Sequence, residues 1–475
     1  AGDALPVRSG LPRRWTWRRE ARALLMVAAD VAALAAAGLG AYLLWALPMR
    51  NQPLELYLRL WPALPLFLAG YAQAGLYPGT GLGPVETLRR ISFVTTLTFL
   101  LLAAASFALQ LPYLYSRVTF AIAFALALVL VPAVRLVVLW LVARTAWWPE
   151  SAVVVTDDAA RAREVVVSLA KARQLGYAPR GIVWLGERGG EPAELGLPVR
   201  AEGDGASERD TVALLATAGA PDAALFDRLQ QRYHRVLVVR GFDDLPVEGI
   251  RVHNLGGFLG LEYTNNLLDA RNRAVKRALD LVLGSLALVV TLPLLALTIL
   301  AVELRSPGPP FFGQARLARG GRRIRVPKVR TMVPGAEAKL EEEMERNPEL
   351  RREWQERMKL RNDPRLVPGV GKFLRRFSLD ELPQLWSVVR GEMSLVGPRP
   401  FPDYHLAQFT PRFLELRQRV RPGITGLWQV TVRSEGPLEQ QEALDTYYIR
   451  NWSVWLDLYI LARTVKAVLG GKGAY

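Results

Sequence analysis

KRALDLVLGSLALVVTLPLLALTILAVELR is the sequence of residues 276–305, and its apolar run begins at Leu281 and ends at Val302. The run is long enough to cross a bilayer, which requires about 20 apolar residues. Pro293 lies near its middle, and proline kinks or breaks a helix because it has no backbone N–H. Both flanks of the run are basic, so a spanning helix would violate the positive-inside rule. We therefore predict a re-entrant membrane helix that breaks at Pro293 and returns to the face it entered, with a fifth spanning helix kinked at Pro293 as the alternative.

Residues 1–150 are predicted to form a four-helix transmembrane bundle. The four apolar stretches are residues 23–48, 57–78, 91–112 and 117–143. Arginines precede the first stretch and end the loop at Arg89 and Arg90, which places the N-terminus and this loop in the cytoplasm. Asp30 and Arg135 interrupt apolar runs. We interpret them as a mutually compensating pair within the bundle, with a functional role as the alternative.

Residues 151–260 have the composition of a soluble α/β domain. Strands are expected at 152–155, 181–185 and 235–240, and a helix at 159–172, which together predict a small parallel sheet. The turn after the first strand contains Asp157 and Asp158, at the place where dinucleotide-binding domains carry a glycine-rich phosphate loop. Because two carboxylates repel phosphate, we expect a Rossmann-like domain without a bound nucleotide, in a structural or regulatory role.

The composition limits the chemistry available to the protein. The 475 residues include 60 Lys and Arg against 44 Asp and Glu, no Cys and three His, and 51% are hydrophobic. The lack of Cys excludes thiol nucleophiles, disulfides and Cys-ligated metals, and three scattered His argue against a Ser-His-Asp triad. Catalysis would then depend on carboxylates, Arg and Lys with a hard cation. The excess of positive charge favours anionic lipid or a phosphorylated substrate rather than a nucleic acid.

A candidate reactive segment lies at residues 373–386, FLRRFSLDELPQLW. Ser378 and Glu381 have the spacing of a capping box, which predicts a helix start and offers a purely structural role for Glu381. Asp380 would lie in the first turn, where the helix dipole favours an ionised carboxylate. Next to Arg375 and Arg376, such a carboxylate can act as a nucleophile or hold a metal ion.

From Lys276 to Tyr475 the chain resembles the bacterial sugar transferases, the monotopic phosphoglycosyltransferases that start membrane glycan assembly. The matching segments are residues 276–280, 306–309, 314–316, 328–332, 363–365, 378–385, 397–400, 421–430 and 451–457. The resemblance implies a mainly α-helical catalytic domain in residues 261–475. Residues 1–260 resemble the front half of the large members, and the members that transfer galactose 1-phosphate to undecaprenyl phosphate are the most similar.

The resemblance also implies a mechanism and a set of site residues. Asp380 would attack the β-phosphorus of a UDP-hexose and expel UMP, and undecaprenyl phosphate would then accept the sugar phosphate. Glu381 would complete the catalytic pair, and Mg²⁺ would be the cofactor with Asp380 as a ligand. The implied substrate-binding residues are Arg375, Arg399, Lys328 and Arg330. For Lys328 and Arg330, a solvated surface charge is the alternative.

These implications lead to a specific functional expectation. Galactose 1-phosphate is the expected cargo, with glucose 1-phosphate as the alternative, in the first membrane step of exopolysaccharide, O-antigen or lipopolysaccharide biosynthesis. The protein is expected in the bacterial inner membrane as a homodimer, with its catalytic domain facing the cytoplasm. A membrane-anchored scaffold is a competing class, but a scaffold has no need of the charged set Arg375, Asp380, Glu381 and Arg399.

Overall fold

The computed structural model describes residues 14–58, 61–108, 116–145, 147–186, 192–201, 211–217, 219, 223–233, 235–239, 251–254, 259–262, 266–267, 270–357, 360, 363–406, 408–432 and 437–470. The chain divides into two compact units, Ala1–Gly241 and Phe242–Tyr475. The helices of the first unit's bundle are α1 (Arg14–Ala41), the π-helical turn η1 (Tyr42–Ala46), α2 (Leu47–Arg50), α3 (Leu54–Leu58), the 3₁₀ turn η2 (Trp61–Ala63), α4 (Leu64–Gln73), α5 (Pro84–Ala108) and α6 (Arg117–Val142).

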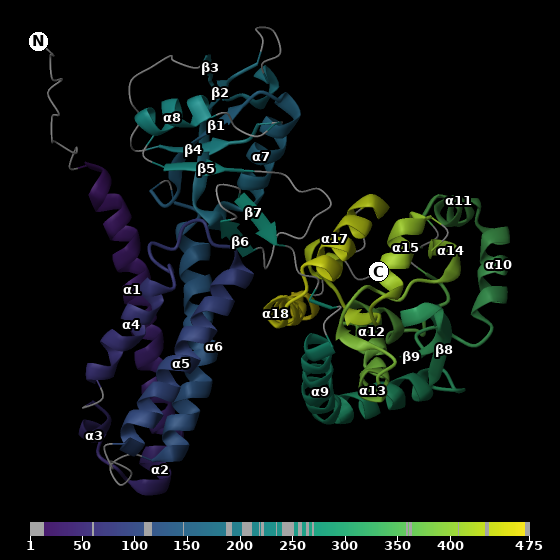
Figure 1. Ribbon diagram of the computed structural model, residues 1–475. Coiled ribbons are helices and arrows are strands. Elements are labelled where there is room, and N and C mark those ends of the chain that lie inside the picture. The colour runs from purple at the N-terminus through teal and green to yellow at the C-terminus, as the bar shows by residue number, and fades with distance from the viewer. Residues whose placement is uncertain are drawn as a thin grey trace, which may run out of the picture. The chain divides into compact units, whose positions relative to one another are not determined.

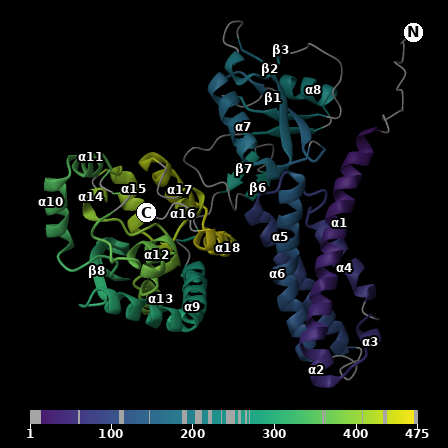
Figure 2. The ribbon, with the colours of Figure 1, turned by 180° about the vertical axis from the view of Figure 1, so that it is seen from behind.

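Three parts of the bundle are long and apolar enough to cross a membrane: Arg18–Arg50, Pro84–Ala108 and Arg117–Val142. They lie side by side in both views (Figures 1 and 2). The second expected segment, 57–78, does not form a continuous helix. Its α4 has ten residues, about 15 Å of helix, and follows a 3₁₀ turn. Pro62 and Pro65 lie at this junction and cannot donate the backbone bonds of a continuous helix.

Asp30 and Arg135 form the ion pair expected inside the bundle. The Arg135 Nε donates to Asp30 Oδ1 at 2.7 Å, and its Nη2 donates to Oδ2 at 2.5 Å. Tyr77 Oη also donates to Oδ2, at 2.6 Å, and Arg135 Nη1 donates to the carbonyl of Leu76. Both charged side chains are almost fully buried. Each carboxylate oxygen is therefore satisfied where water is excluded.

The rest of the first unit is a five-stranded parallel sheet in the order β3-β2-β1-β4-β5. Its elements are β1 (Glu150–Thr156), α7 (Ala159–Lys171), η3 (Arg173–Leu175), β2 (Tyr177–Trp184), η4 (Ala193–Leu195), β3 (Val199–Ala201), β4 (Val212–Leu215), α8 (Ala223–Arg232) and β5 (Arg235–Val238). Alternate residues of β1 face opposite sides: Val154 packs in a core that includes α7, and Val155 in one that includes α8. Asp158 accepts hydrogen bonds from the backbone N–H groups of Ala160 and Arg161 and so caps α7 itself.

The second unit opens with an antiparallel strand pair and continues into a long apolar helix and a mostly helical domain. Its elements are β6 (Arg251–Asn254), β7 (Leu259–Glu262), α9 (Ala270–Arg305), β8 (Phe311–Leu317), η5 (Arg319–Gly321), β9 (Arg323–Val329), α10 (Ala336–Arg346), α11 (Pro348–Arg357), α12 (Gly371–Arg376), η6 (Leu379–Glu381), α13 (Gln384–Arg390), β10 (Ser394–Val396), α14 (Asp403–Leu406), α15 (Pro411–Gln418), β11 (Gly423–Thr425), α16 (Leu427–Thr431), α17 (Leu438–Arg450) and α18 (Val454–Gly470). Strands β8 and β9 form an antiparallel hairpin, and β10 pairs with β11 in parallel.

Helix α9 is continuous through Pro293, so the chain does not leave the helical conformation at the predicted break. Figures 1 and 2 nevertheless show α9 as two arms that meet at a sharp bend. Both arms pack on the same domain: Arg277 donates to the carbonyls of Val388 and Val389, and Val302 is fully buried in a cluster with Leu374. By length and composition the helix could also cross a membrane.

The apolar side chains of α9 are largely uncovered by protein. Those more than half exposed include Val282, Leu286, Val289, Val290, Leu297, Leu300 and Leu304. So large an apolar surface is typical of a segment in contact with lipid. Its first turns are fixed by polar contacts, because Asp280 accepts from Ser394 Oγ and the Leu395 N–H, and Lys276 pairs with Asp457 at 2.7 Å.

Candidate active site

Asp380 and Glu381 lie in η6, between α12 and α13. The predicted capping box is wrong: Ser378 has φ +55°, in the left-handed region, and its side chain caps no helix. An N-cap residue needs extended backbone to place its oxygen over the first turn. The Glu381 side chain instead accepts hydrogen bonds from Lys328 and Arg399, which lie far from it in the sequence. Asp380 lies in η6, a 3₁₀ turn of three residues. A turn of this length has no substantial helix dipole, so the expected effect of a dipole on Asp380 is absent.

Glu381 is held by two cationic side chains. Lys328 Nζ and Arg399 Nη2 both donate to its Oε1, at 2.7 and 2.8 Å. Burial by itself would raise the pKa of Glu381, but Arg399 and Lys328 outweigh it and lower this pKa to about 2. Glu381 raises the pKa of Arg399 in return. The carboxylate is therefore a fixed negative charge that orients one Lys and one Arg beside Asp380.

Asp380 is only 7% exposed and is less fully paired than its neighbour. Its Oδ2 lies 3.6 Å from Lys328 Nζ. Burial raises the pKa of Asp380, and the charge of Glu381 adds to this, whereas Lys328, Arg375 and Arg399 act against it. A poorly solvated carboxylate close to cations, without a direct guanidinium bond in the described structure, is suited to attack an electrophile that brings its own negative charge.

Arg375 extends the cationic surroundings from α12. Its Nε donates to Thr331 Oγ1 at 3.0 Å. Burial lowers the pKa of Arg375, while the nearby charges of Asp380 and Asp363 raise it. Thr331, the second residue after the β8–β9 hairpin, was not singled out from the sequence, although it lies in the quoted motif 328–332. Its hydroxyl fixes the orientation of this guanidinium.

Arg330 lies two residues beyond Lys328 but makes different contacts. Its Nη2 donates to the carbonyls of Ser306 and Gly308, in the turn that follows α9. Gly308 has φ +134°, and a Cβ there would lie 3.1 Å from Arg330 Nη1. Of the two basic residues predicted to bind substrate, Lys328 in β9 contacts the carboxylates, and Arg330, directly after β9, contacts the turn at the end of α9.

The residues present fit a magnesium ion only if substrate completes the site. Among the described residues, no group of three or more His, Asp or Glu side chains is close enough to hold a metal. Magnesium in phosphoryl-transfer sites takes one or two carboxylates and completes its shell with water and substrate phosphates. Asp380 fits this role better than Glu381, whose Oε1 is already shared by two cations.

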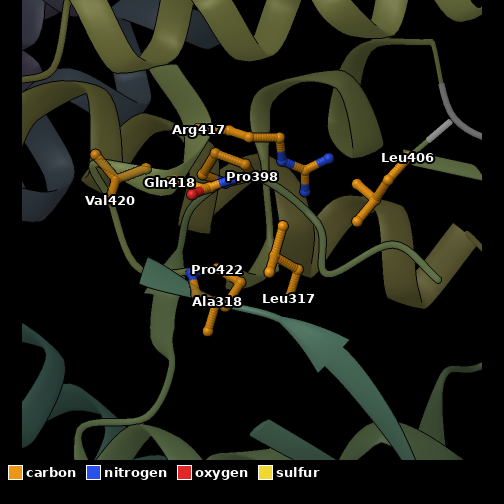
Figure 3. A pocket seen from close by; sticks show the side chains of 8 residues that line it. All are labelled: Leu317, Ala318, Pro398, Leu406, Arg417, Gln418, Val420 and Pro422. Carbon is orange, nitrogen blue, oxygen red and sulfur yellow. The ribbon is translucent and has the colours of Figure 1, made fainter. Parts of the chain in front are cut away.

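The pocket in Figure 3 lies beside the loop of residues 397–402 between β10 and α14, called the Arg399 loop, and not at the two carboxylates. Its lining residues are Leu317, Ala318, Pro398, Leu406, Arg417, Gln418, Val420 and Pro422. Pro398 precedes Arg399, and Arg417 donates to the Arg399 carbonyl. Neither Arg417 nor the pocket was expected from the sequence.

Residues 271–471 match the family model described as bacterial sugar transferase. The exopolysaccharide production protein ExoY of Sinorhizobium fredii is 40% identical over 200 residues, which are 42% of this chain and 88% of that protein. The chain belongs to the bacterial sugar transferase family. It is therefore a membrane-associated family member, with four described helices that are long and apolar enough to span.

Two larger relatives in the bacterial sugar transferase family carry names with different sugars. The UDP-galactose-lipid carrier transferase of Erwinia amylovora is 44% identical over 216 residues, 45% of this chain and 44% of that protein. The UDP-glucose:undecaprenyl-phosphate glucose-1-phosphate transferase of Escherichia coli is 36% identical over 272 residues, 56% of this chain and 55% of that protein. The part of the chain that matches thus spans less than half the length of the Erwinia relative.

Proposed function

We propose that the protein transfers a hexose 1-phosphate from a UDP-hexose to undecaprenyl phosphate and releases UMP. The observation that carries the proposal is the cluster of Lys328, Arg399 and Glu381 around the buried Asp380. A diphosphate repels a carboxylate nucleophile, and this site supplies cations where that repulsion arises. The names of the relatives support the lipid acceptor and a sugar nucleotide donor.

The reaction proceeds in two displacements at the same phosphorus. The Asp380 carboxylate attacks the β-phosphorus of the UDP-hexose, the bond to the bridging oxygen breaks, and UMP leaves with the bonding electrons. A phosphate oxygen of undecaprenyl phosphate then attacks the aspartyl phosphate, and the Asp380 carboxylate leaves. The product is a lipid-linked diphosphate sugar, and the carboxylate is regenerated.

Each cation has a place in this scheme. Lys328 lies close to both carboxylates and neutralises charge at the attacked phosphorus, and Arg399 and Arg375 bind the phosphate oxygens of the donor or of the lipid. Glu381 holds Lys328 and Arg399 in place and does not form the covalent bond. A bound Mg²⁺, with Asp380 among its ligands, supplies further positive charge to the diphosphate.

Galactose 1-phosphate is the cargo that we propose first, and glucose 1-phosphate is the alternative. Purified protein in nanodiscs with undecaprenyl phosphate should release UMP from UDP-galactose faster than from UDP-glucose. Asp380→Asn is the inactive reference, and Glu392→Gln, an outlying acid paired with Arg390, is the control for an uninvolved carboxylate. Faster release from UDP-glucose would select the alternative sugar, and no release from any UDP-hexose would refute the proposed function.

We also propose that α9 re-enters the cytoplasmic face of the inner membrane, where the soluble donor is found, and that the protein is a homodimer. The two packed arms of α9 and their basic flanks support the return to one face. Cysteines can test it because the chain has none. Ala270→Cys and Arg322→Cys are suitable exposed positions, since neighbouring Gly321 has φ +75° and would be strained by a side chain. Both should label only from the cytoplasm; labelling of Arg322→Cys from outside would establish a spanning helix.

A further inference from the structure

Arg417 on α15 is a buried arginine that the proposed reaction has not used. It is 8% exposed, and its Nη2 donates to the backbone carbonyl of Arg399. The guanidinium lies 4.9 Å from the ring centre of Phe401 and 5.6 Å from that of Phe413. In Figure 3 it points between Pro398 and Leu406. Burying this charge is costly, so its position calls for a physical reason.

The loop that Arg417 contacts carries one of the cations of the active site. On one side of the loop, the Gly397 N–H donates to Thr425 O and the Gly423 N–H donates to Pro398 O, both at 2.9 Å. These bonds attach the loop to β11. Arg417 adds a bond at the next carbonyl along, that of Arg399, whose own side chain reaches Glu381. The backbone of Arg399 is thereby held from β11 and from α15.

A second buried ionisable side chain accompanies Arg417. Asp445 on α17 is 1% exposed, and neither of its carboxylate oxygens has a hydrogen-bond partner among the described residues. Helix α15, which carries Arg417, packs against α17. Burial lowers the pKa of Arg417, and the charge of Asp445 acts against this. Acidic and basic side chains thus extend through the domain, from Asp445 and Arg417 through the Arg399 backbone to the cluster of Arg399, Glu381, Lys328 and Asp380.

We propose that Arg417, accompanied by the buried acid Asp445 of α17, is a positioning residue for Arg399. This inference rests on the proposed function, in which Arg399 binds phosphate oxygens. The planar guanidinium suits the task because it can donate to a carbonyl while its faces contact aromatic rings, which a lysine ammonium does less well. If Arg417 served packing alone, an apolar side chain of similar length would replace it without loss.

The test removes the pair without leaving a lone buried charge. Arg417→Met with Asp445→Asn should lower kcat/KM for UMP release about 10- to 100-fold, as expected when a phosphate-binding group is displaced. Arg417→Lys keeps the charge and can still donate to the Arg399 carbonyl, so its loss of activity should be smaller. Arg419→Met is the matched control, because Arg419 follows on the same segment but is exposed and paired with Glu415.

A double-mutant cycle separates positioning from general stability. If the pair acts through Arg399, its removal should cost little further activity, within about twofold, in an Arg399→Ala background. The proposal would be overturned if the activity losses of the pair variant and of Arg399→Ala multiplied when combined. It would also be overturned if the pair variant were as active as Arg419→Met. Should the pair variant fail to give monodisperse protein, Arg417→Lys takes its place in the same cycle.

A second readout does not depend on the reaction. Hydrogen–deuterium exchange in the peptide that contains residues 396–401 should accelerate in the pair variant and stay unchanged in Arg419→Met. If wild-type protein releases no UMP from any UDP-hexose, the proposed function fails, and this exchange alone decides the positioning role. Unchanged exchange in the pair variant would then refute it.

Discussion

The protein buries an acidic and basic cluster in each of its two units, and the clusters differ in how fully the carboxylates are satisfied. In the bundle, both oxygens of Asp30 accept short hydrogen bonds from Arg135, and Tyr77 adds a third. In the catalytic unit, Glu381 is similarly held, but the nearest cation to Asp380 in the described ion pairs is an ammonium at 3.6 Å. A carboxylate with all its partners is structural, whereas one left short of partners can bind or react with a substrate.

The largest expected effect follows from removing the less satisfied carboxylate. Asp380→Asn should reduce UMP release more than about 10³-fold, because the nucleophile is lost. Glu381→Gln should cost less, about 10- to 100-fold, because it loosens Lys328 and Arg399 without removing the nucleophile. Mass spectrometry of wild-type protein incubated with the nucleotide sugar alone should find a hexose phosphate on the Asp380 peptide. Normal adduct formation in Asp380→Asn would exclude the assignment.

The satisfied pair should behave in the opposite way. Asp30→Asn leaves Arg135 buried without its counter-charge and should destabilise the folded protein by about 3–5 kcal/mol. The melting temperature in detergent should fall, while the rate of UMP release per folded protein should not change. Asp30→Asn with Arg135→Gln should recover part of the stability. An unchanged melting temperature in Asp30→Asn would contradict the prediction. It would mean that a buried, fully paired carboxylate is not necessarily a structural one.

Asp445 provides an intermediate case. Burial raises its pKa to about 7, although Arg417 lowers it, and the unfolded value is close to 4. Between these pH values the folded state binds more protons than the unfolded state, so wild-type stability falls as pH rises from about 4 to 7, by at most about 4 kcal/mol. Asp445→Asn lacks this loss. Its melting temperature relative to wild type should therefore rise between pH 5 and pH 8, and a pH-independent difference would contradict the prediction.

The smallest effect is expected from removing the first unit. A truncated protein that begins at Phe242 keeps the β6–β7 pair and all the proposed site residues. In nanodiscs it should release UMP within about tenfold of the full chain, a difference of about 1.4 kcal/mol. Folding is checked by circular dichroism, and size-exclusion chromatography tests whether dimerisation suffers. A folded, membrane-bound fragment without UMP release would show that the first unit is needed to complete the site.

Local patterns predicted much of the architecture. The strand predicted at 152–155 lies within β1, the helix predicted at 159–172 is α7, and the strand predicted at 235–240 is confirmed over Arg235–Val238. Period and composition decide such elements. The Asp30–Arg135 pair is confirmed as well, since two opposite charges in apolar helices leave few other arrangements. The second membrane segment shows where composition is insufficient: its hydropathy is suitable, but Pro62 and Pro65 interrupt the backbone bonding.

The site required information that local patterns do not hold. Ser378 and Glu381 match a capping box in spacing, but Lys328, 53 residues before Glu381, and Arg399, 18 residues after it, take the carboxylate instead. Arg417 lies among Arg412, Arg419 and Arg421, and nothing in that series distinguishes the one that is buried. Its role depends on the return of the chain beneath the Arg399 loop, which is a property of tertiary packing.

The cap on α7 has a consequence for any ligand approaching the parallel sheet. Asp158 already accepts from the N–H groups of Ala160 and Arg161, where a phosphate would bind in a nucleotide-binding relative of this fold. Its carboxylate is part of the chain, so its effective concentration at these N–H groups is of millimolar order or higher. A free diphosphate would have to displace this tethered anion and also approach a negative charge. The Asp158 carboxylate therefore competes with any phosphate for the first N–H groups of α7, and it cannot diffuse away from them.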